Sequence, residues 1–141
     1  MSSNKTRTLE IGDRMADGTI FAGISPDSGR NMFVTPKDAS GVLKWKAAMK
    51  YAADLDANGH KDWRLPTNAE LDALCLNRDR GALKGTFDTS GSYPSGWYWS
   101  ATEDAGNPDY VWMERFSGGN RFWQRKEGVA SVRPVRSEPR P

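Results

Sequence analysis

The clearest helical pattern lies in residues 43–56, where apolar side chains recur every three or four positions. The apolar face is made by Trp45, Ala48, Met49, Ala52 and Leu55. Charged residues lie off this face, and such a pattern predicts an amphipathic helix that packs one side against a sheet. The Asn58-Gly59 pair that follows is typical of a helix end.

A second helix is predicted to begin at Thr67. Pro66 disfavours helical geometry at the residue before it, so the arm formed by residues 62–66 should be extended. Thr67 then serves as the N-cap, and Glu70 lies three residues later, which is the spacing of a capping box. The apolar stripe of this helix is made by Leu71, Leu74 and Cys75. The pattern fades near Arg80.

Alternating, β-branched and aromatic residues favour strands elsewhere in the chain. The predicted strands are residues 8–11, 19–24, 31–35, 97–101, 110–116, 121–125 and 129–136. Residues 81–96 form a long connection, which Phe87 should anchor, and residues 103–109 form a polar loop. These elements predict an α+β domain of two helices on twisted antiparallel sheets over residues 1–136, with a frayed polar tail at 137–141.

The connection between the last two aromatic strands decides which side chains their hairpin displays. A loop of residues 118–120 pairs Phe116 with Phe122 and turns both toward the core. A four-residue loop would turn Arg121 and Arg125 inward, where their charges lose hydration. We therefore choose the three-residue loop. The outer face is then made by Met113, Arg115, Arg121, Trp123 and Arg125.

Length and composition limit the function classes. The chain has 141 residues, enough for one domain with a core that needs no metal or disulfide. Cys75 is the only cysteine, which excludes an internal disulfide, and such residues are usually buried and inert. Six tryptophans are a high content for a chain of this length, and tryptophan is enriched at binding surfaces.

The charge and the terminal segment bear on partners and location. A formal net charge of only +2 argues against nucleic acid, although arginines beside aromatic rings also suit single strands. No apolar run is long enough to span a membrane. Residues 1–7 lack the apolar core of a signal peptide, so we expect a cytoplasmic protein or part of a phage particle, unless an export signal was removed.

Catalytic and metal sites find little support in the sequence. His60 is the only histidine, and its neighbours offer neither a tetrahedral metal cluster nor a Ser-His-Asp set. Calcium would need carboxylates and an amide around Pro108, which Glu103, Asn107 and Asp109 could supply. We expect no catalysis, no metal and no cofactor, and keep calcium as the alternative.

One motif resembles a known family. Residues 62–71 read Asp-Trp-Arg-Leu-Pro-Thr-x-x-Glu-Leu, and residues 98–102 read Tyr-Trp-Ser-Ala-Thr. With the tryptophan and tyrosine of the first helix, this order resembles the C-terminal domain of Legionella collagen-like proteins over residues 17–136. The resemblance implies a fold like that of C-type lectins, the formylglycine-generating enzyme and the variable proteins of diversity-generating retroelements. It also implies that Trp112 and Phe116 point inward.

The resemblance favours recognition over chemistry. The related enzymes use a cysteine pair, whereas Cys75 is alone here. We therefore predict a module that binds a glycan or a protein surface, as adhesin-like and phage-receptor-like members do. The predicted site residues are Arg115, Arg121, Trp123, Arg125, Asn107, Asp109 and Tyr110. Arg115 would hold an anionic group bidentately and Trp123 would stack on the ligand.

An assembly role is the alternative. In that reading the same arginines and tryptophan form a subunit contact in a phage particle or another oligomer. A homo-oligomer therefore stays open as a partner, whereas nucleic acid and membrane insertion are not expected.

Overall fold

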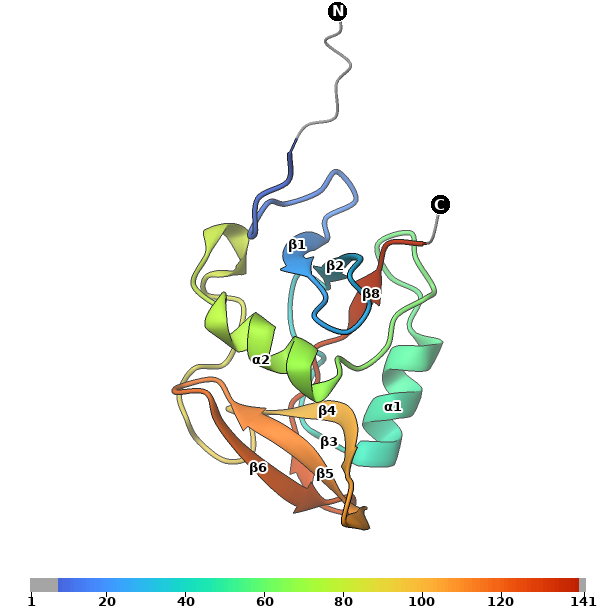
Figure 1. Ribbon diagram of the computed structural model, residues 1–141, viewed down its shortest axis with the longest axis vertical. Helices are drawn as coiled ribbons and strands as arrows, with labels where there is room; N and C mark the ends of the chain where they lie inside the picture. Colours follow the sequence, from blue (N-terminus) through green and yellow to red (C-terminus); the bar gives the residue numbers. More distant parts are fainter. Residues whose placement is uncertain (1–7, 140–141) are drawn as a thin grey trace, which may run out of the picture.

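The computed structural model describes residues 8–139, and in that range the chain forms two α-helices, one 3-10 helix and eight strands (Figure 1). The elements are β1 Ile20–Ile24, β2 Asn31–Val34, β3 Leu43–Lys44, α1 Trp45–Asp54, α2 Asn68–Leu76, η1 Gly81–Leu83, β4 Trp97–Asp104, β5 Asn107–Arg115, β6 Asn120–Arg125, β7 Val129–Ala130 and β8 Val135–Ser137. The predicted α+β class is confirmed.

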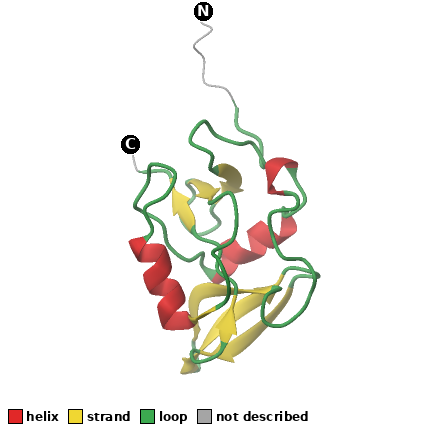
Figure 2. Cartoon of the chain, turned by 180° about the vertical axis from the view of Figure 1, so that it is seen from behind, coloured by secondary structure: helices red, strands yellow, loops and turns green. Residues whose placement is uncertain are grey.

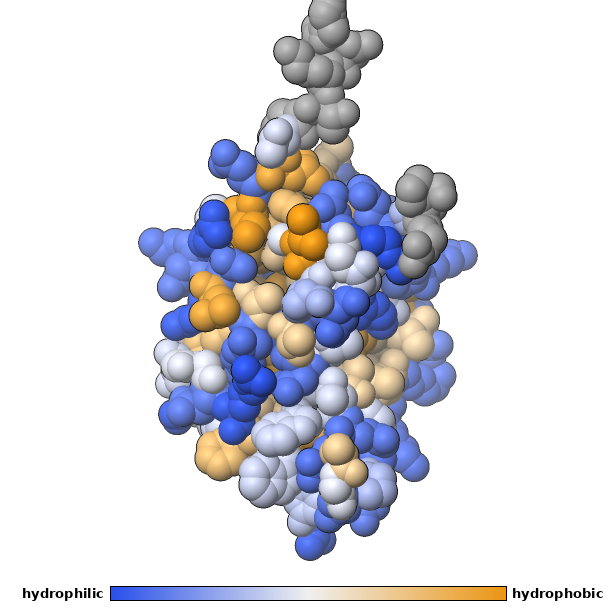
Figure 3. All heavy atoms as spheres, viewed as in Figure 1, coloured by the Kyte–Doolittle hydropathy of each residue, from blue (hydrophilic) through white to orange (hydrophobic). Residues whose placement is uncertain are grey.

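The strands form three antiparallel sheets, with the orders β1-β2-β8, β3-β7 and β4-β5-β6. In Figure 1 the first sheet lies toward the end that carries both termini, and the β4-β5-β6 sheet lies at the opposite end. Helix α2 crosses between them and α1 flanks one side, an arrangement also visible from behind (Figure 2). In Figure 3 strongly hydrophobic residues gather near β1, whereas the opposite end mixes pale and hydrophilic ones.

The β4-β5-β6 sheet is packed on both faces. One cluster of buried residues contains Ile20, Met32, Leu71, Leu74, Tyr98 and Phe116. The other contains Trp45, Ala48, Leu65, Trp97, Trp99, Val111, Met113 and Val132. Tyr98 and Trp99 are neighbours on β4, and successive side chains of a strand point to opposite faces. Strand β4 is therefore buried on both sides and joins the two halves of the core.

The capping box at the start of α2 is confirmed. The Thr67 hydroxyl accepts a hydrogen bond from the Glu70 N–H (3.2 Å), and the Glu70 carboxylate accepts one from the Thr67 N–H (2.9 Å). The same buried carboxylate also binds Arg64 through two nitrogens (2.7 and 3.0 Å) and the hydroxyl of Ser25 (2.6 Å). Trp63 is buried, and its indole N–H donates to the Ala57 carbonyl. This segment therefore fixes an extended arm and a helix start together.

The prediction of a first strand at residues 8–11 is wrong. Residues 8–10 are irregular and the chain turns at Gly12, which has a φ of +97°. The Asp13 carboxylate accepts a hydrogen bond from the Glu10 N–H (2.9 Å) and closes this turn. Local turn chemistry outweighs the short apolar alternation here.

Both helices are shorter than their patterns predicted. Leu43 and Lys44 form β3, so α1 begins at Trp45. Helix α1 ends at Asp54, and Asn58 and Gly59 instead make a separate turn between Ala57 and His60. Helix α2 ends at Leu76 rather than near Arg80. Phe87 is buried and anchors its loop, as predicted.

Two predicted boundaries in the C-terminal third also differ. Residues 103–109 are not a loop, because β4 and β5 extend to Asp104 and Asn107 and leave a two-residue turn. Polar residues can form a strand where the hairpin projects into solvent. The expected continuous strand 129–136 is divided, since β7 pairs with β3 and β8 pairs with β2.

The C-terminal end of the chain is more ordered than predicted. Ser137, expected in the tail, pairs with Met32 in β8, and the Glu138 N–H donates to the Asn31 carbonyl. Residues 1–7 and 140–141 lie outside the described part. None of the described helices combines the length and the apolar character needed to cross a bilayer.

Candidate ligand-binding site on strand β6

Strand β6 forms one edge of the β4-β5-β6 sheet and exposes most of its side chains. Phe122 is 52% exposed and Trp123 is 51% exposed. Water contact on so much aromatic surface is unfavourable unless a partner covers it. Strand β6 is therefore a candidate binding surface.

The predicted pairing of Phe116 with Phe122 is wrong. Strand β6 pairs Trp123 with Trp112, Phe122 with Met113 and Asn120 with Arg115, so residues 116–119 form a four-residue connection. Phe116 leaves the strand and is buried among aromatic rings on the α2 side of the sheet. The burial of the Phe116 ring favours this register, because pairing Phe116 with Phe122 would keep Phe116 within the sheet.

This register divides the predicted outer face. Arg121, Trp123 and Arg125 share one face, whereas Met113 and Arg115 lie on the other, because a shift by an odd number of residues reverses the faces. Met113 is buried rather than displayed. Arg121 and Arg125 do lie on the side of the sheet that α2 packs against, yet the Arg121 side chain is 46% exposed. The helix does not cover the sheet as far as β6, so the expected burial cost does not arise.

We call the exposed surface made by Tyr110, Trp112, Arg121, Trp123 and Arg125 the basic-aromatic face. Trp112, expected in the core, is only half-buried and meets Trp123 edge-to-face at 5.6 Å between ring centroids. The Arg125 guanidinium lies 5.9 Å from the Tyr110 ring and donates to its hydroxyl (3.3 Å). Arg121 Nη2 lies 3.5 Å from Asp72 Oδ2. Two guanidinium groups are thus displayed around an indole that a neighbour holds in place.

A polar hollow of about 330 Å³ lies at the end of this face. It is lined by Asn107, Asp109, Tyr110, Arg125 and Glu127. The structure therefore brings Asn107, Asp109 and Tyr110 next to Arg125, although they begin strand β5 rather than lie in a loop. In the calcium alternative Glu103 would join them, but its carboxylate binds Lys126 at 2.5 Å. Within residues 8–139 no three acidic, histidine or cysteine side chains converge as a metal site.

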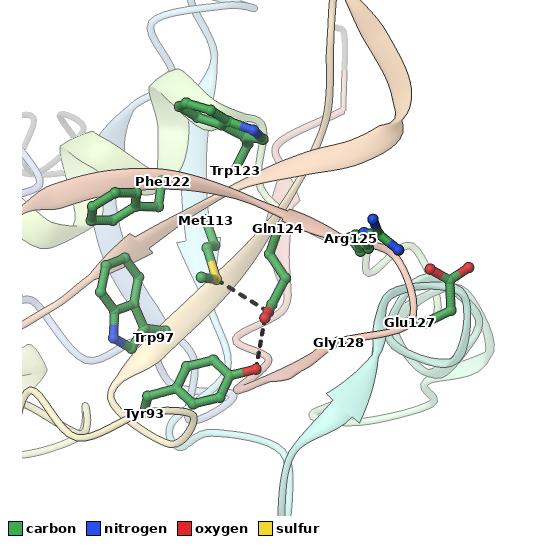
Figure 4. A pocket seen from close by; sticks show the side chains of 9 residues that line it. All are labelled: Tyr93, Trp97, Met113, Phe122, Trp123, Gln124, Arg125, Glu127 and Gly128. Carbon is green, nitrogen blue, oxygen red and sulfur yellow. Dashed lines mark hydrogen bonds between the residues drawn. The ribbon is translucent and has the colours of Figure 1, made fainter.

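The opposite face of β6 carries a larger hollow of about 580 Å³, which we call the aromatic hollow (Figure 4). Its wall is formed mainly by Tyr93, Trp97, Met113, Phe122 and Gln124. Figure 4 shows Trp123 on the other side of the β6 ribbon, pointing away from this hollow. The Tyr93 hydroxyl donates to the side-chain oxygen Oε1 of Gln124 (2.6 Å), and the side-chain Nε2 of Gln124 donates to the Val129 carbonyl (3.2 Å). The polar groups of Tyr93 and Gln124 are therefore already hydrogen-bonded to each other or to the backbone, and the exposed surface is mainly apolar.

Arg115 borders the aromatic hollow instead of the basic-aromatic face. Its guanidinium lies 5.5 Å from the Trp97 ring and donates to the Asn120 side-chain oxygen (2.8 Å). Sequence reasoning missed the roles of Tyr93 and Trp97 in this surface. The dense aromatic run at residues 97–99 was the available signal, but its alternation does not say which ring faces a hollow.

The model of the Lcl C-terminal domain matches residues 19–136. The chain belongs to the Lcl C-terminal domain family. No curated protein sequence matches the chain significantly. The resemblance expected from the central motif is confirmed, whereas the likeness to C-type lectins and to retroelement variable proteins stays a prediction. Membership of this family suggests a binding module.

This Lcl C-terminal domain also encloses a carboxyl group that the sequence did not reveal. Glu114 is fully buried, and no other described residue forms a hydrogen bond with either of its oxygens. Burial raises the pKa of Glu114 to about 8, and the nearby Asp72 carboxyl adds to the rise. Burial also raises the pKa of Cys75 to about 12, so its thiol stays protonated and unreactive at neutral pH.

Proposed function

We propose that this Lcl C-terminal domain is a non-catalytic recognition module that binds an anionic group of a glycan or protein surface at the basic-aromatic face. One observation carries the proposal: Trp123 is half exposed on an edge strand, between Arg121 and Arg125. Guanidinium groups form paired hydrogen bonds with carboxylate, sulfate or phosphate. An indole adds a flat apolar surface on which a ligand can stack.

The contacts within the face assign a part to each residue. Trp112 supports Trp123 edge-on, so less rotational freedom is lost when a ligand stacks. Within residues 8–139 the one hydrogen bond of the Arg125 side chain joins its Nε to Tyr110, which leaves the two terminal nitrogens for an anion. Asn107, Asp109 and Tyr110 border the site through the polar hollow. Arg115 lies on the opposite face, and we assign it no part in holding this anion.

The surroundings of the reactive side chains support binding rather than catalysis. The raised pKa of Cys75 argues against a nucleophilic thiol. His60 Nε2 lies 2.7 Å from the Asp17 carboxylate. His60 belongs to the surface turn that ends the first half of the chain. The His60 ring is therefore occupied by a contact that ties two segments of the fold together.

An assembly role is the second candidate, and the exposure of both Phe122 and Trp123 favours it. The same surface would then be covered by another subunit. The particle or oligomer would need this contact, so removing Trp123 should dissociate it.

The test compares wild type with Trp123→Ala on an array of acidic and neutral glycans and in pull-downs of surface proteins. Tyr51→Ala is the matched control, because Tyr51 is an exposed aromatic residue on α1, away from β6. We expect Trp123→Ala alone to weaken binding by roughly 1–3 kcal/mol, without a change in melting temperature. Rising salt should weaken wild-type binding, because the arginines are exposed.

Equal binding by wild type and Trp123→Ala would contradict the proposal. Light scattering separates the two candidate roles. A wild-type oligomer that becomes monomeric on Trp123→Ala would replace recognition by assembly.

A further inference from the structure

Strand β6 has an open outer edge, in contrast to the edges formed by β4 and β1. The β4 edge is covered by Ser131, whose N–H donates to the Trp97 carbonyl (2.7 Å). The β1 edge is covered by the preceding turn, where the Phe21 N–H donates to the Asp13 carbonyl (2.8 Å). In the described part of the chain, β6 pairs only with β5. An uncovered edge with exposed aromatic side chains is a template for another strand.

The hydrogen-bond pattern shows which backbone groups of β6 face outward. The Lys126 N–H donates to the Asp109 carbonyl of the neighbouring strand, and inward and outward groups alternate along an antiparallel pair. Gln124 and Phe122 therefore also face β5, whereas Arg121, Trp123 and Arg125 face outward. The Arg125 carbonyl is taken by the Gly128 N–H (2.9 Å). The N–H and C=O groups of Arg121 and Trp123 remain available at the edge.

The two surfaces beside this edge differ in chemistry. On one side the basic-aromatic face presents Arg121 and Arg125. On the other side the aromatic hollow reaches Phe122, and the polar groups of Tyr93 and Gln124 in its wall are already bonded. A strand laid along β6 places alternate side chains on these two sides. Acidic side chains suit the first side and apolar ones suit the hollow.

Charge argues against a second copy of this chain as the added strand. A symmetric antiparallel pair centred on Trp123 would set Arg121 opposite the Arg125 of the other copy, twice. Like charges directly opposite one another in a sheet are destabilising. Strand β6 carries no acidic residue that could relieve them.

We propose that β6 captures an extended segment of a partner protein, with acidic residues alternating with apolar ones, by adding it to the sheet as a further strand. This inference rests on the proposed function and names the class of its ligand. Main-chain hydrogen bonds to Arg121 and Trp123 align the segment, the arginines bind its acidic side chains, and the aromatic hollow takes an apolar one.

The probe is a displayed library of random ten-residue peptides, selected on the wild-type chain. We expect enrichment of acidic residues at every second position, with an apolar residue between them. Arg121→Pro and Arg121→Ala form the matched pair of variants. Both remove the charge, but only proline removes the outward N–H, and it leaves the pairing with β5 intact. Selected peptides should bind Arg121→Pro at least tenfold more weakly than Arg121→Ala.

Amide hydrogen exchange of the wild-type chain keeps the test valid even where Arg121→Pro does not fold. A selected peptide should slow exchange of the Arg121 and Trp123 N–H groups at least tenfold. Equal affinity of both variants, or no such protection, overturns strand addition. Binding of acidic glycans without any selected peptide overturns it too, while the proposed function stands. If neither glycan nor peptide binds, the proposed function itself fails, and the edge arginines only protect β6 from aggregation.

Discussion

Glu114 shows how one side chain can make the whole fold sensitive to pH. Its carboxyl group is enclosed between β5 and α2, with Asp72 and Cys75 on the helix side and Arg121 toward the strand edge. Nothing there solvates a negative charge well, and burial raises the pKa of Glu114 from 4.5 to about 8. The folded chain therefore keeps a proton that the unfolded chain releases above its ordinary pKa.

The sign of the pH effect follows from this difference. The contribution of Glu114 to stability is full below the unfolded pKa near 4.5 and is lost as the pH rises to the folded pKa near 8. Between pH 5 and 8 we expect the free energy of unfolding to fall by up to about 4 kcal/mol because of this group, since each pKa unit corresponds to about 1.4 kcal/mol. Denaturant titrations at pH 5, 6, 7 and 8 measure the slope.

Glu114→Gln removes the ionisable proton while keeping the shape, so the part of the slope due to Glu114 should vanish and the variant should be more stable than wild type at pH 8. Glu127→Gln, at an exposed carboxylate near the other end of β6, is the control and should keep the wild-type slope. A wild-type stability that stays level from pH 5 to 8 would show that Glu114 is already charged in the folded chain.

At the scale of elements, the start of α2 was predictable because its signals are local. The chain itself carries Pro66, Thr67 and Glu70 at the spacing that a capped helix requires. The sequence did not reveal that the Glu70 carboxylate also binds Arg64 and Ser25, because Ser25 lies 45 residues away. Long-range partners of this kind depend on the tertiary fold.

The hairpin of β5 and β6 was mispredicted for a related reason. Burying the charges of Arg121 and Arg125 would be costly, but the prediction assumed that another layer covers the whole face of the sheet. Coverage is set by the length and position of α2, which strand patterning does not encode. The position of Phe116 is equally non-local, since it depends on rings from the loop at Phe87 and from β4. The predicted site residues therefore lie near one another, but they are divided between two faces of the sheet instead of sharing one.

The double use of Glu70 predicts an unequal effect of two substitutions at one helix start. Thr67→Ala removes one capping contact and an exposed hydrogen bond to the Asp27 carboxylate, and should cost about 1 kcal/mol. Glu70→Ala should cost about 3 kcal/mol or more, because it also leaves Arg64 without its partner and Ser25 without an acceptor. Chemical denaturation of the two variants measures the difference.

Asp54→Ala serves as a comparison for Glu70→Ala, because it breaks the exposed Lys50–Asp54 pair and should leave the unfolding midpoint unchanged. Equal losses for Thr67→Ala and Glu70→Ala would mean that the Arg64 contact adds nothing beyond the cap.

Across the whole molecule, the core is held together without an internal cross-link. Strand β4 contributes to both hydrophobic clusters, and the fully buried Arg133 binds two other segments of the chain. Its guanidinium donates to the carbonyls of Thr35 and Thr86 and pairs with Asp38 at 3.1 Å. These contacts join the end of β2, the loop after η1 and the segment before β8 around one charge.

A core of this kind should not need a metal for stability. We expect thermal melts recorded with and without a calcium chelator to superimpose, both for wild type and for Asp109→Asn. A fall of several degrees in wild type on adding chelator, and not in Asp109→Asn, would restore the calcium alternative at Glu103, Asn107 and Asp109.

The exposure of β6 also bears on how this domain can evolve. Most of its side chains are exposed, whereas β4 and β5 carry the buried residues. Substitutions on β6 therefore alter the chemistry of the surface with small effects on folding. New specificities can arise by changing a few consecutive codons while the inherited scaffold stays the same.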